Sequence, residues 1–162
     1  MAASPHRGKL IVDGRAFPCA LGRSAIVSVK REGDGGTPRG RFRLIGLWRR
    51  PDRKPLRCLL PTRRIRPDQG WCDAPDHRLY NRPVRLPFAA SHEAMWRSDH
   101  LYDLVADIDW NRGPIIKGKG SAIFLHAARP DYSATAGCVA LSPGDLRRLF
   151  GRISRNCLIQ IE

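Results

Sequence analysis

Two side chains in the segment spanning residues 121–141 could together perform acyl-transfer chemistry. The segment reads SAIFLHAARPDYSATAGCVAL, in which an apolar run ends at His126 and a small, polar stretch leads to Cys138. A cysteine is already nucleophilic near neutral pH, and a nearby histidine can act as its base and raise its thiolate fraction. Gly137 leaves the backbone beside the thiol open to a substrate carbonyl, and Thr135 is a polar residue in an apolar neighbourhood. The pattern predicts covalent catalysis by a thiol.

A purely structural interpretation competes with this one. Free cysteine is among the most buried residue types and commonly serves as a small hydrophobic residue, and a histidine can be a satisfied core residue. The position of His126 at the end of a predicted buried strand, shortly before the glycine–cysteine pair, favours catalysis.

These residues resemble the L,D-transpeptidase catalytic domain family (YkuD-like), whose site pattern is a strand-ending histidine followed by a Ser/Thr-His-Gly-Cys loop. Here the loop reads Thr135-Ala136-Gly137-Cys138. The resemblance extends through residues 120–126 (GSAIFLH) and through residues 37–40 (TPRG), which match a Thr-Pro-x-Gly turn of the family. Most of the chain is covered.

The resemblance implies that Cys138 attacks the carbonyl between the L-centre residue (diaminopimelate) and D-Ala in a murein tetrapeptide. It makes His126 the base, the amides of Gly137 and Cys138 an oxyanion hole, and Thr135 a support for the loop. It also implies that a backbone carbonyl near Ala127, in place of a carboxylate, orients His126.

The sequence departs from the family pattern in three ways. The spacing of twelve from His126 to Cys138 is short, Ala136 replaces a second histidine, and Ala140 replaces a polar or arginine residue. Other side chains must then contact the substrate. The candidates are Arg129, Tyr132, Asn81 and Arg82.

The acceptor that attacks the thioester decides the product. Water gives an L,D-carboxypeptidase of peptidoglycan recycling, whereas an amine gives a cross-linking transpeptidase of cell-wall biogenesis. The sequence as given begins without an apolar leader segment, so we expect a cytoplasmic carboxypeptidase, or a periplasmic protein if the start lies upstream. Five scattered cysteines without a Cys-x-x-Cys pair fit reduced thiols in the cytosol.

Charge leaves a second class of function open. The net charge is +14, with basic residues crowded in residues 49–66, which favours an acidic partner. That partner is the acidic murein peptide in the first interpretation. In the alternative it is nucleic acid, with Trp48 and Trp71 as stacking surfaces, although no nucleic-acid-binding signature is present. A third interpretation is a lapsed domain that binds murein without cleaving it.

We expect neither a metal nor another cofactor. The residues that would have to hold zinc lack a recognisable ligand spacing. They are His77, His92, His100 and Asp103.

The strand and turn patterns around the site predict a mainly β fold. The family resemblance implies a YkuD-like sandwich of twisted mixed sheets with a few short flanking helices. We expect one domain over residues 1–162, with an ordered Pro/Arg-rich insertion at about residues 49–87. A hairpin should turn at Asp13-Gly14, residues 91–97 should form one or two helical turns, and residues 121–126 should form a buried strand. The other expected strands are residues 25–29, 41–48, 102–108 and 156–162. Ser142 should cap a helix that begins at Pro143 and stops at Gly151.

Overall fold

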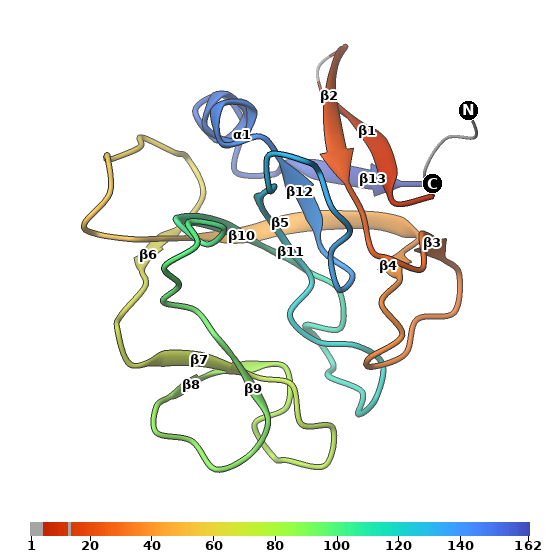
Figure 1. Ribbon diagram of the computed structural model, residues 1–162, viewed down its shortest axis with the longest axis vertical. Coiled ribbons are helices and arrows are strands. Elements are labelled where there is room, and N and C mark those ends of the chain that lie inside the picture. Colours follow the sequence, from red (N-terminus) through yellow and green to blue (C-terminus); the bar gives the residue numbers. More distant parts are fainter. Residues whose placement is uncertain (1–4, 13) are drawn as a thin grey trace.

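The centre of the computed structural model, which describes residues 5–12 and 14–162, is a mixed sheet of eight strands (Figure 1). Its order is β1-β2-β12-β11-β10-β5-β13, and β6 pairs with β5. The pairs β11/β12 and β5/β6 are parallel and the others are antiparallel. The bounds are β1 (Arg7–Val12), β2 (Arg15–Ala20), β5 (Gly40–Arg49), β6 (Thr62–Arg64), β10 (Leu104–Ile108), β11 (Phe124–Ala127), β12 (Val139–Leu141) and β13 (Leu158–Ile161).

Two smaller sheets complete the fold. A three-stranded sheet has the order β8-β7-β9, and it lies at the far end of the molecule from the helix in Figure 1. A parallel pair joins β3 and β4. The bounds are β3 (Ile26–Val27), β4 (Thr37–Pro38), β7 (Gln69–Cys72), β8 (Arg82–Arg85) and β9 (His92–Ala94). The mainly β, mixed-sheet prediction is confirmed.

The first hairpin forms as predicted, with β1 and β2 antiparallel. Gly14 has φ of 72°, a value that favours glycine, and Asp13 lies outside the described residues. The predicted strands at residues 41–48, 102–108 and 156–162 also form, within a few residues of their expected ends. The strand expected at residues 25–29 shortens to β3.

The segment at residues 91–97 was expected to be helical, and this prediction is wrong. It contributes β9, in which His92, Glu93 and Ala94 pair with β7. Pairing with the fully buried strand β7 satisfies the backbone hydrogen-bonding groups of this segment. An isolated helical turn would be only marginally stable in water. The expected few flanking helices reduce to α1 (Pro143–Phe150) among the described residues.

The helix α1 begins as predicted. The Ser142 hydroxyl accepts a hydrogen bond from the Asp145 amide, and Pro143 occupies the first turn. Gly151 ends it with φ of −72°, so the stop does not use the left-handed conformation in which glycine is favoured. The apolar face of the helix is buried against the core.

The insertion is ordered and supplies β6, β7 and β8. Trp71, on β7, packs edge-to-face against Trp48 and Phe124 of the main sheet. Trp71 is 0% exposed and Trp48 is 8% exposed, so neither can stack on a nucleic-acid base. The predicted stacking role of these two residues is therefore wrong, because they fill the space between the sheets.

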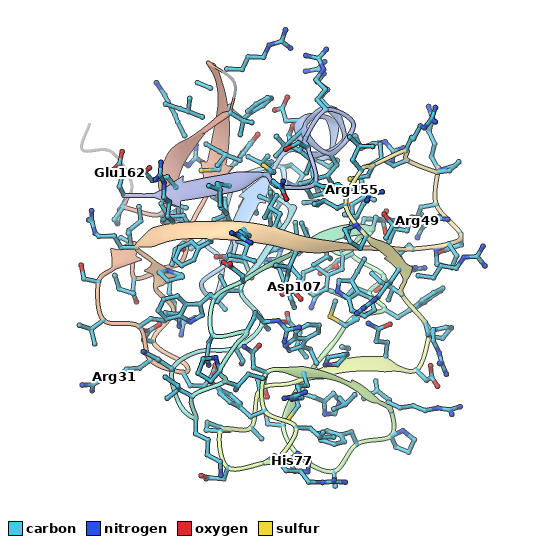
Figure 2. All side chains as sticks on the ribbon, turned by 180° about the vertical axis from the view of Figure 1, so that it is seen from behind. Arg31, Arg49, His77, Asp107, Arg155 and Glu162 are labelled. Carbon is cyan, nitrogen blue, oxygen red and sulfur yellow. The ribbon has the colours of Figure 1, made fainter. Side chains whose placement is uncertain are left out.

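Charged side chains lie mainly at the periphery. Figure 2 shows Arg31, Arg49, Arg155 and Glu162 at the edges of the molecule, with Asp107 inside it. Asp107 is buried and forms an ion pair with Arg112. Basic residues occur along the whole chain and are not confined to the segment of residues 49–66.

Candidate active site

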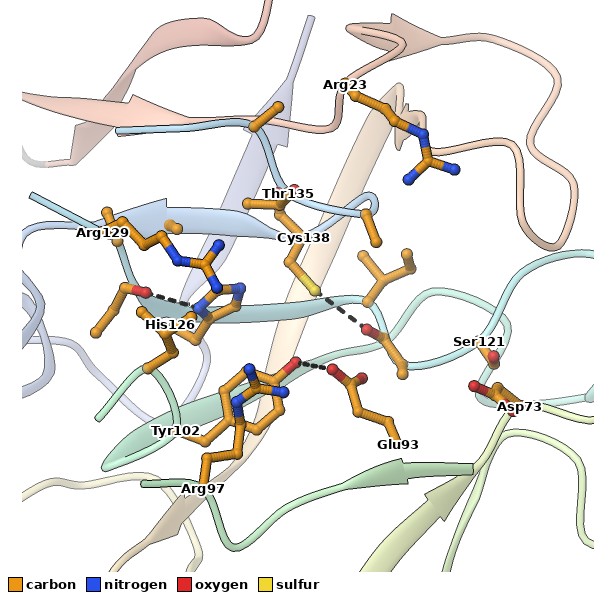
Figure 3. A pocket seen from close by; sticks show the side chains of 18 of the residues that line it. Arg23, Asp73, Glu93, Arg97, Tyr102, Ser121, His126, Arg129, Thr135 and Cys138 are labelled. Atoms are coloured by element: carbon orange, nitrogen blue, oxygen red, sulfur yellow. Dashed lines mark hydrogen bonds between the residues drawn. The ribbon is translucent and has the colours of Figure 1, made fainter. Parts of the chain in front are cut away.

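Parallel pairing of β11 and β12 brings His126 and Cys138 together. His126 lies beside Ala140 in the ladder, and Cys138 immediately precedes β12. Side chains alternate along a strand, so Cys138 and Ala140 project from the same face of the sheet as His126. The methyl group of Ala140 leaves room on that face. Figure 3 shows the thiol and the imidazole on these neighbouring strands at one cavity.

The thiol is held by the backbone just before β11. Cys138 Sγ donates to the carbonyl of Ala122 over 3.2 Å and accepts from the amide of Phe124 over 3.4 Å. Ala122 has φ of 50°, which directs its carbonyl out of a regular strand. The strand predicted over residues 121–126 therefore begins only at Phe124. Ala122, which the prediction placed in the strand, instead positions the thiol through its carbonyl.

The orientation of His126 follows from one backbone hydrogen bond. Its Nδ1 lies 2.8 Å from the carbonyl oxygen of Ala127. A carbonyl only accepts, so Nδ1 carries the proton, and Nε2 of the neutral ring is left as the basic nitrogen. The predicted carbonyl near Ala127 thus holds the imidazole, as a carboxylate does in other triads.

Burial keeps the resting pair neutral. It raises the pKa of Cys138 to about 12, with the nearby negative charge of Glu93 adding to the effect. Burial also lowers the pKa of His126 to about 4, an effect that the Ala127 hydrogen bond opposes. Desolvation thus favours the neutral form of both groups before substrate binds. Proton transfer must accompany attack on the substrate.

Thr135 supports the cysteine loop. Its hydroxyl donates a hydrogen bond to the Cys138 carbonyl over 2.7 Å and accepts one from the Gly137 amide over 3.1 Å. The Thr135 amide donates to the Leu21 carbonyl, and the Thr135 carbonyl accepts from the Arg23 amide. The Gly137 amide, expected as an oxyanion donor, is therefore bound to Thr135 in this structure.

Gly137 is required for its backbone conformation. Its φ is 138°, and a Cβ added there would lie 2.8 Å from the carbonyl oxygen of Gly36. The Thr-Pro-x-Gly turn follows Gly36 directly, and Thr37 Oγ1 accepts the Gly22 amide in the buried interior. The turn that carries part of the family resemblance thus packs behind the cysteine loop.

A cavity of about 500 Å³ surrounds the pair. Among the predicted site residues, those that line it are His126, Arg129, Thr135 and Cys138. The other predicted substrate contacts lie elsewhere. Tyr132 packs on the alanine cluster around Ala140. Asn81 is buried, accepting from the Trp71 indole and the Ala122 amide, while Arg82 is exposed on β8.

Several cavity residues carried no signal in the sequence. Glu93, Arg97 and Tyr102 line the cavity from β9 and the segment that leads into β10 (Figure 3). The tyrosine hydroxyl donates to Glu93 Oε1, and its ring lies 5.1 Å from the imidazole of His126. The assignment of residues 91–97 to helical turns concealed these side chains, because their approach depends on β9 pairing with β7.

Basic groups gather beside His126. Arg97 and Arg129 both face Asp99, the first through two hydrogen bonds and the second at 3.9 Å. Two guanidinium groups thus share one carboxylate, and one positive charge is left uncompensated at that wall of the cavity.

A buried thiol beside an imidazole of fixed tautomer, at a cavity of substrate size, defines a cysteine acyl-transfer site. A model of the L,D-transpeptidase catalytic domain (YkuD) matches residues 5–161. The chain belongs to this family, whose catalytic domain acts on peptidoglycan. Searches of curated proteins and of solved structures returned no significant match.

The described residues offer no alternative site of two common kinds. In the part of the chain that the structure describes, no group of three or more His, Cys, Asp and Glu side chains is arranged to hold a metal ion. No helix of the described residues is long and apolar enough to cross a membrane. Among the described residues, no two cysteines are joined by a disulfide bond.

Proposed function

We propose that the protein hydrolyses the bond between the L-centre residue, diaminopimelate, and D-Ala in murein tetrapeptides, as an L,D-carboxypeptidase of peptidoglycan recycling. The observation that carries the proposal is the placement of Cys138 and His126 on one face of two parallel strands, at a cavity that also holds an excess arginine charge. The family match supports the class of reaction.

The proposed reaction begins with attack of Cys138 Sγ on the carbonyl carbon, while its proton passes to His126 Nε2. The C–N bond then breaks, the proton moves to the leaving amine of D-Ala, and a thioester remains on Cys138. A water molecule attacks the thioester, giving one proton to His126. The S–C bond breaks, and the proton returns to the sulfur.

The oxyanion of each tetrahedral intermediate needs a donor near Cys138. We assign this role to the Cys138 amide, since the Gly137 amide is held by Thr135. Release of Gly137 from Thr135 on substrate binding would add a second donor.

Arg129 supports cleavage at a chain end. Its side chain is more than half exposed, and its nearest carboxylate, Asp99, is already bound by Arg97. An accessible arginine fork beside the catalytic base suits the terminal carboxylate of D-Ala, a group that an endopeptidase substrate lacks.

The test is mass spectrometry of a murein tetrapeptide incubated with the protein, with and without an amine acceptor. Loss of one D-Ala without an amine adduct supports the carboxypeptidase. A peptide dimer or an amine adduct would instead establish the alternative, a cross-linking L,D-transpeptidase. No Cys138-dependent product would refute both, and would favour the binding-only interpretation.

The compartment is part of the proposal. Cysteines that form no disulfide bond among the described residues suit the cytosol, where thiols are kept reduced and where recycled murein peptides are trimmed. Fractionation of cells expressing the native gene, with detection of the protein in the cytosol or the periplasm, tests this placement.

A further inference from the structure

A carboxylate without a cationic partner faces the thiol. Glu93, in β9, lines the cavity that holds Cys138 and His126. Its Oε1 accepts the Tyr102 hydroxyl, and among the described residues no cation lies within ion-pair distance of it. The nearest arginine of the same segment, Arg97, lies close enough for its charge to lower the pKa of Glu93, but its guanidinium is bound by Asp99.

The position of Glu93 disfavours ionisation of the Cys138 thiol before substrate binds. Burial raises the pKa of Glu93, and its charge is one of the causes that raise the pKa of Cys138. Of the other groups near Cys138, Lys30 acts in the opposite direction and Tyr102 carries no charge at neutral pH. A half-buried carboxylate beside a nucleophile, without an ion-pair partner, costs free energy unless a ligand supplies the cation.

A second carboxylate lies on the same side of the cavity. Asp73 also lines the cavity, and its Oδ1 is buried without a hydrogen-bond partner among the described residues. The charge of Asp73 adds to the rise in the pKa of Glu93, so the two carboxylates are close enough to repel each other. Figure 3 shows them on the side of Cys138 away from Arg129.

Most of the cavity's carboxylates lie on one side of the thiol. Arg97 and Arg129 lie beside His126, whereas Glu93 and Asp73 lie on the other side of Cys138, where Arg23 also lines the cavity. In a chain with a net charge of +14, an acidic end is not a consequence of overall composition. It suits a substrate with a cationic group on one side of the reacting carbonyl and an anionic group on the other.

We infer that Glu93, held by the Tyr102 hydroxyl, is a specificity-determining residue that binds a primary ammonium group on the side chain of the substrate's acyl-donor residue. This inference rests on the proposed function and assigns to Glu93 the recognition of the free side-chain amine that diaminopimelate carries. The bound ammonium offsets the charge of Glu93, so the correct substrate also removes part of the opposition to thiolate formation at Cys138.

Binding to the inactive protein tests the inference separately from catalysis. Two tetrapeptides are compared by calorimetry on the Cys138→Ala protein, one with a free side-chain amine and one with that amine acetylated. We expect the free amine to bind roughly 10- to 100-fold more tightly, the range for a charge-assisted hydrogen bond. Adding Glu93→Gln should remove the preference, and adding Glu162→Gln, at an exposed position, should leave it unchanged.

Turnover by the active protein gives a second readout. Glu93→Gln should lower kcat/KM for the free-amine peptide by the same factor and leave that for the acetylated peptide within about threefold. Equal binding of both peptides to the Cys138→Ala protein would overturn the inference, as would an equal loss on both in Glu93→Gln. A preserved binding preference without any turnover would instead overturn the proposed reaction, and leave the ammonium site standing.

Discussion

Gly137→Ala isolates the backbone conformation that presents Cys138. The glycine has φ of 138°, which L residues rarely adopt, and a Cβ there would meet the Gly36 carbonyl oxygen at 2.8 Å. Conformational strain of this kind costs about 1–3 kcal/mol, and the contact forces the loop or the Gly36 turn to move. At roughly 3 °C per kcal/mol for a chain of this size, we expect the Tm to fall by about 3–9 °C.

The activity should fall further than the stability. Movement of the loop shifts Cys138 relative to His126, and a displacement of about 1 Å can cost on the order of 100-fold in rate. Thermal unfolding and Cys138-dependent peptide cleavage, measured on folded protein, give the two values. Gly144→Ala in α1 is the control, because no atom lies within 4 Å of the added Cβ, and it should leave the rate unchanged and the Tm the same or slightly higher. A Gly137→Ala protein with wild-type Tm and rate would refute this account of the loop.

Three further perturbations have defined outcomes. His126 is neutral when buried, with its pKa lowered from 6.5 to about 4, so its contribution to stability is complete above pH 6.5 and is lost as the pH falls toward 4. Between pH 6.5 and 4 the free energy of unfolding, measured by denaturant titration, should fall by about 3 kcal/mol less in His126→Gln than in the wild type. The same fall in both proteins would contradict the buried neutral ring. Asn81→Ala should cost about 2–4 kcal/mol, because it leaves the Trp71 indole and the Ala122 amide without their acceptor, whereas Arg82→Ala on the exposed strand should stay within about 0.5 kcal/mol. Ser142→Ala should cost about 1 kcal/mol through the lost N-cap, seen as a lower midpoint in urea with an unchanged m-value.

The parts of the site that lie close together in the chain could be predicted from the sequence. His126 ends an apolar run and Cys138 follows a glycine within one short segment, so residue types and spacing were enough to select both. The cap at Ser142 and the hairpin strands are likewise short-range patterns. The Ala127 carbonyl that orients His126 came from the family resemblance, and the structure places it at 2.8 Å.

The remainder depends on contacts between distant segments. Glu93 and Tyr102 reach the thiol only because β9 pairs with β7 and packs beneath the main sheet, and a local helical pattern at residues 91–97 hid this pairing. Asn81 was selected as a substrate contact from its residue type alone, yet its amide is used to hold Trp71 and Ala122. The neutral resting pair depends on burial, which spacing along the chain does not reveal.

The most direct test of the central claim is to trap the acyl-enzyme. Intact-protein mass spectrometry is performed on a quenched reaction with a murein tetrapeptide, followed by digestion to locate the adduct. We predict an added mass equal to the tetrapeptide without D-Ala, attached at Cys138, released by hydroxylamine and missing in Cys138→Ala. An adduct on another cysteine, or cleavage that persists in Cys138→Ala, would contradict the assignment of Cys138 as the nucleophile.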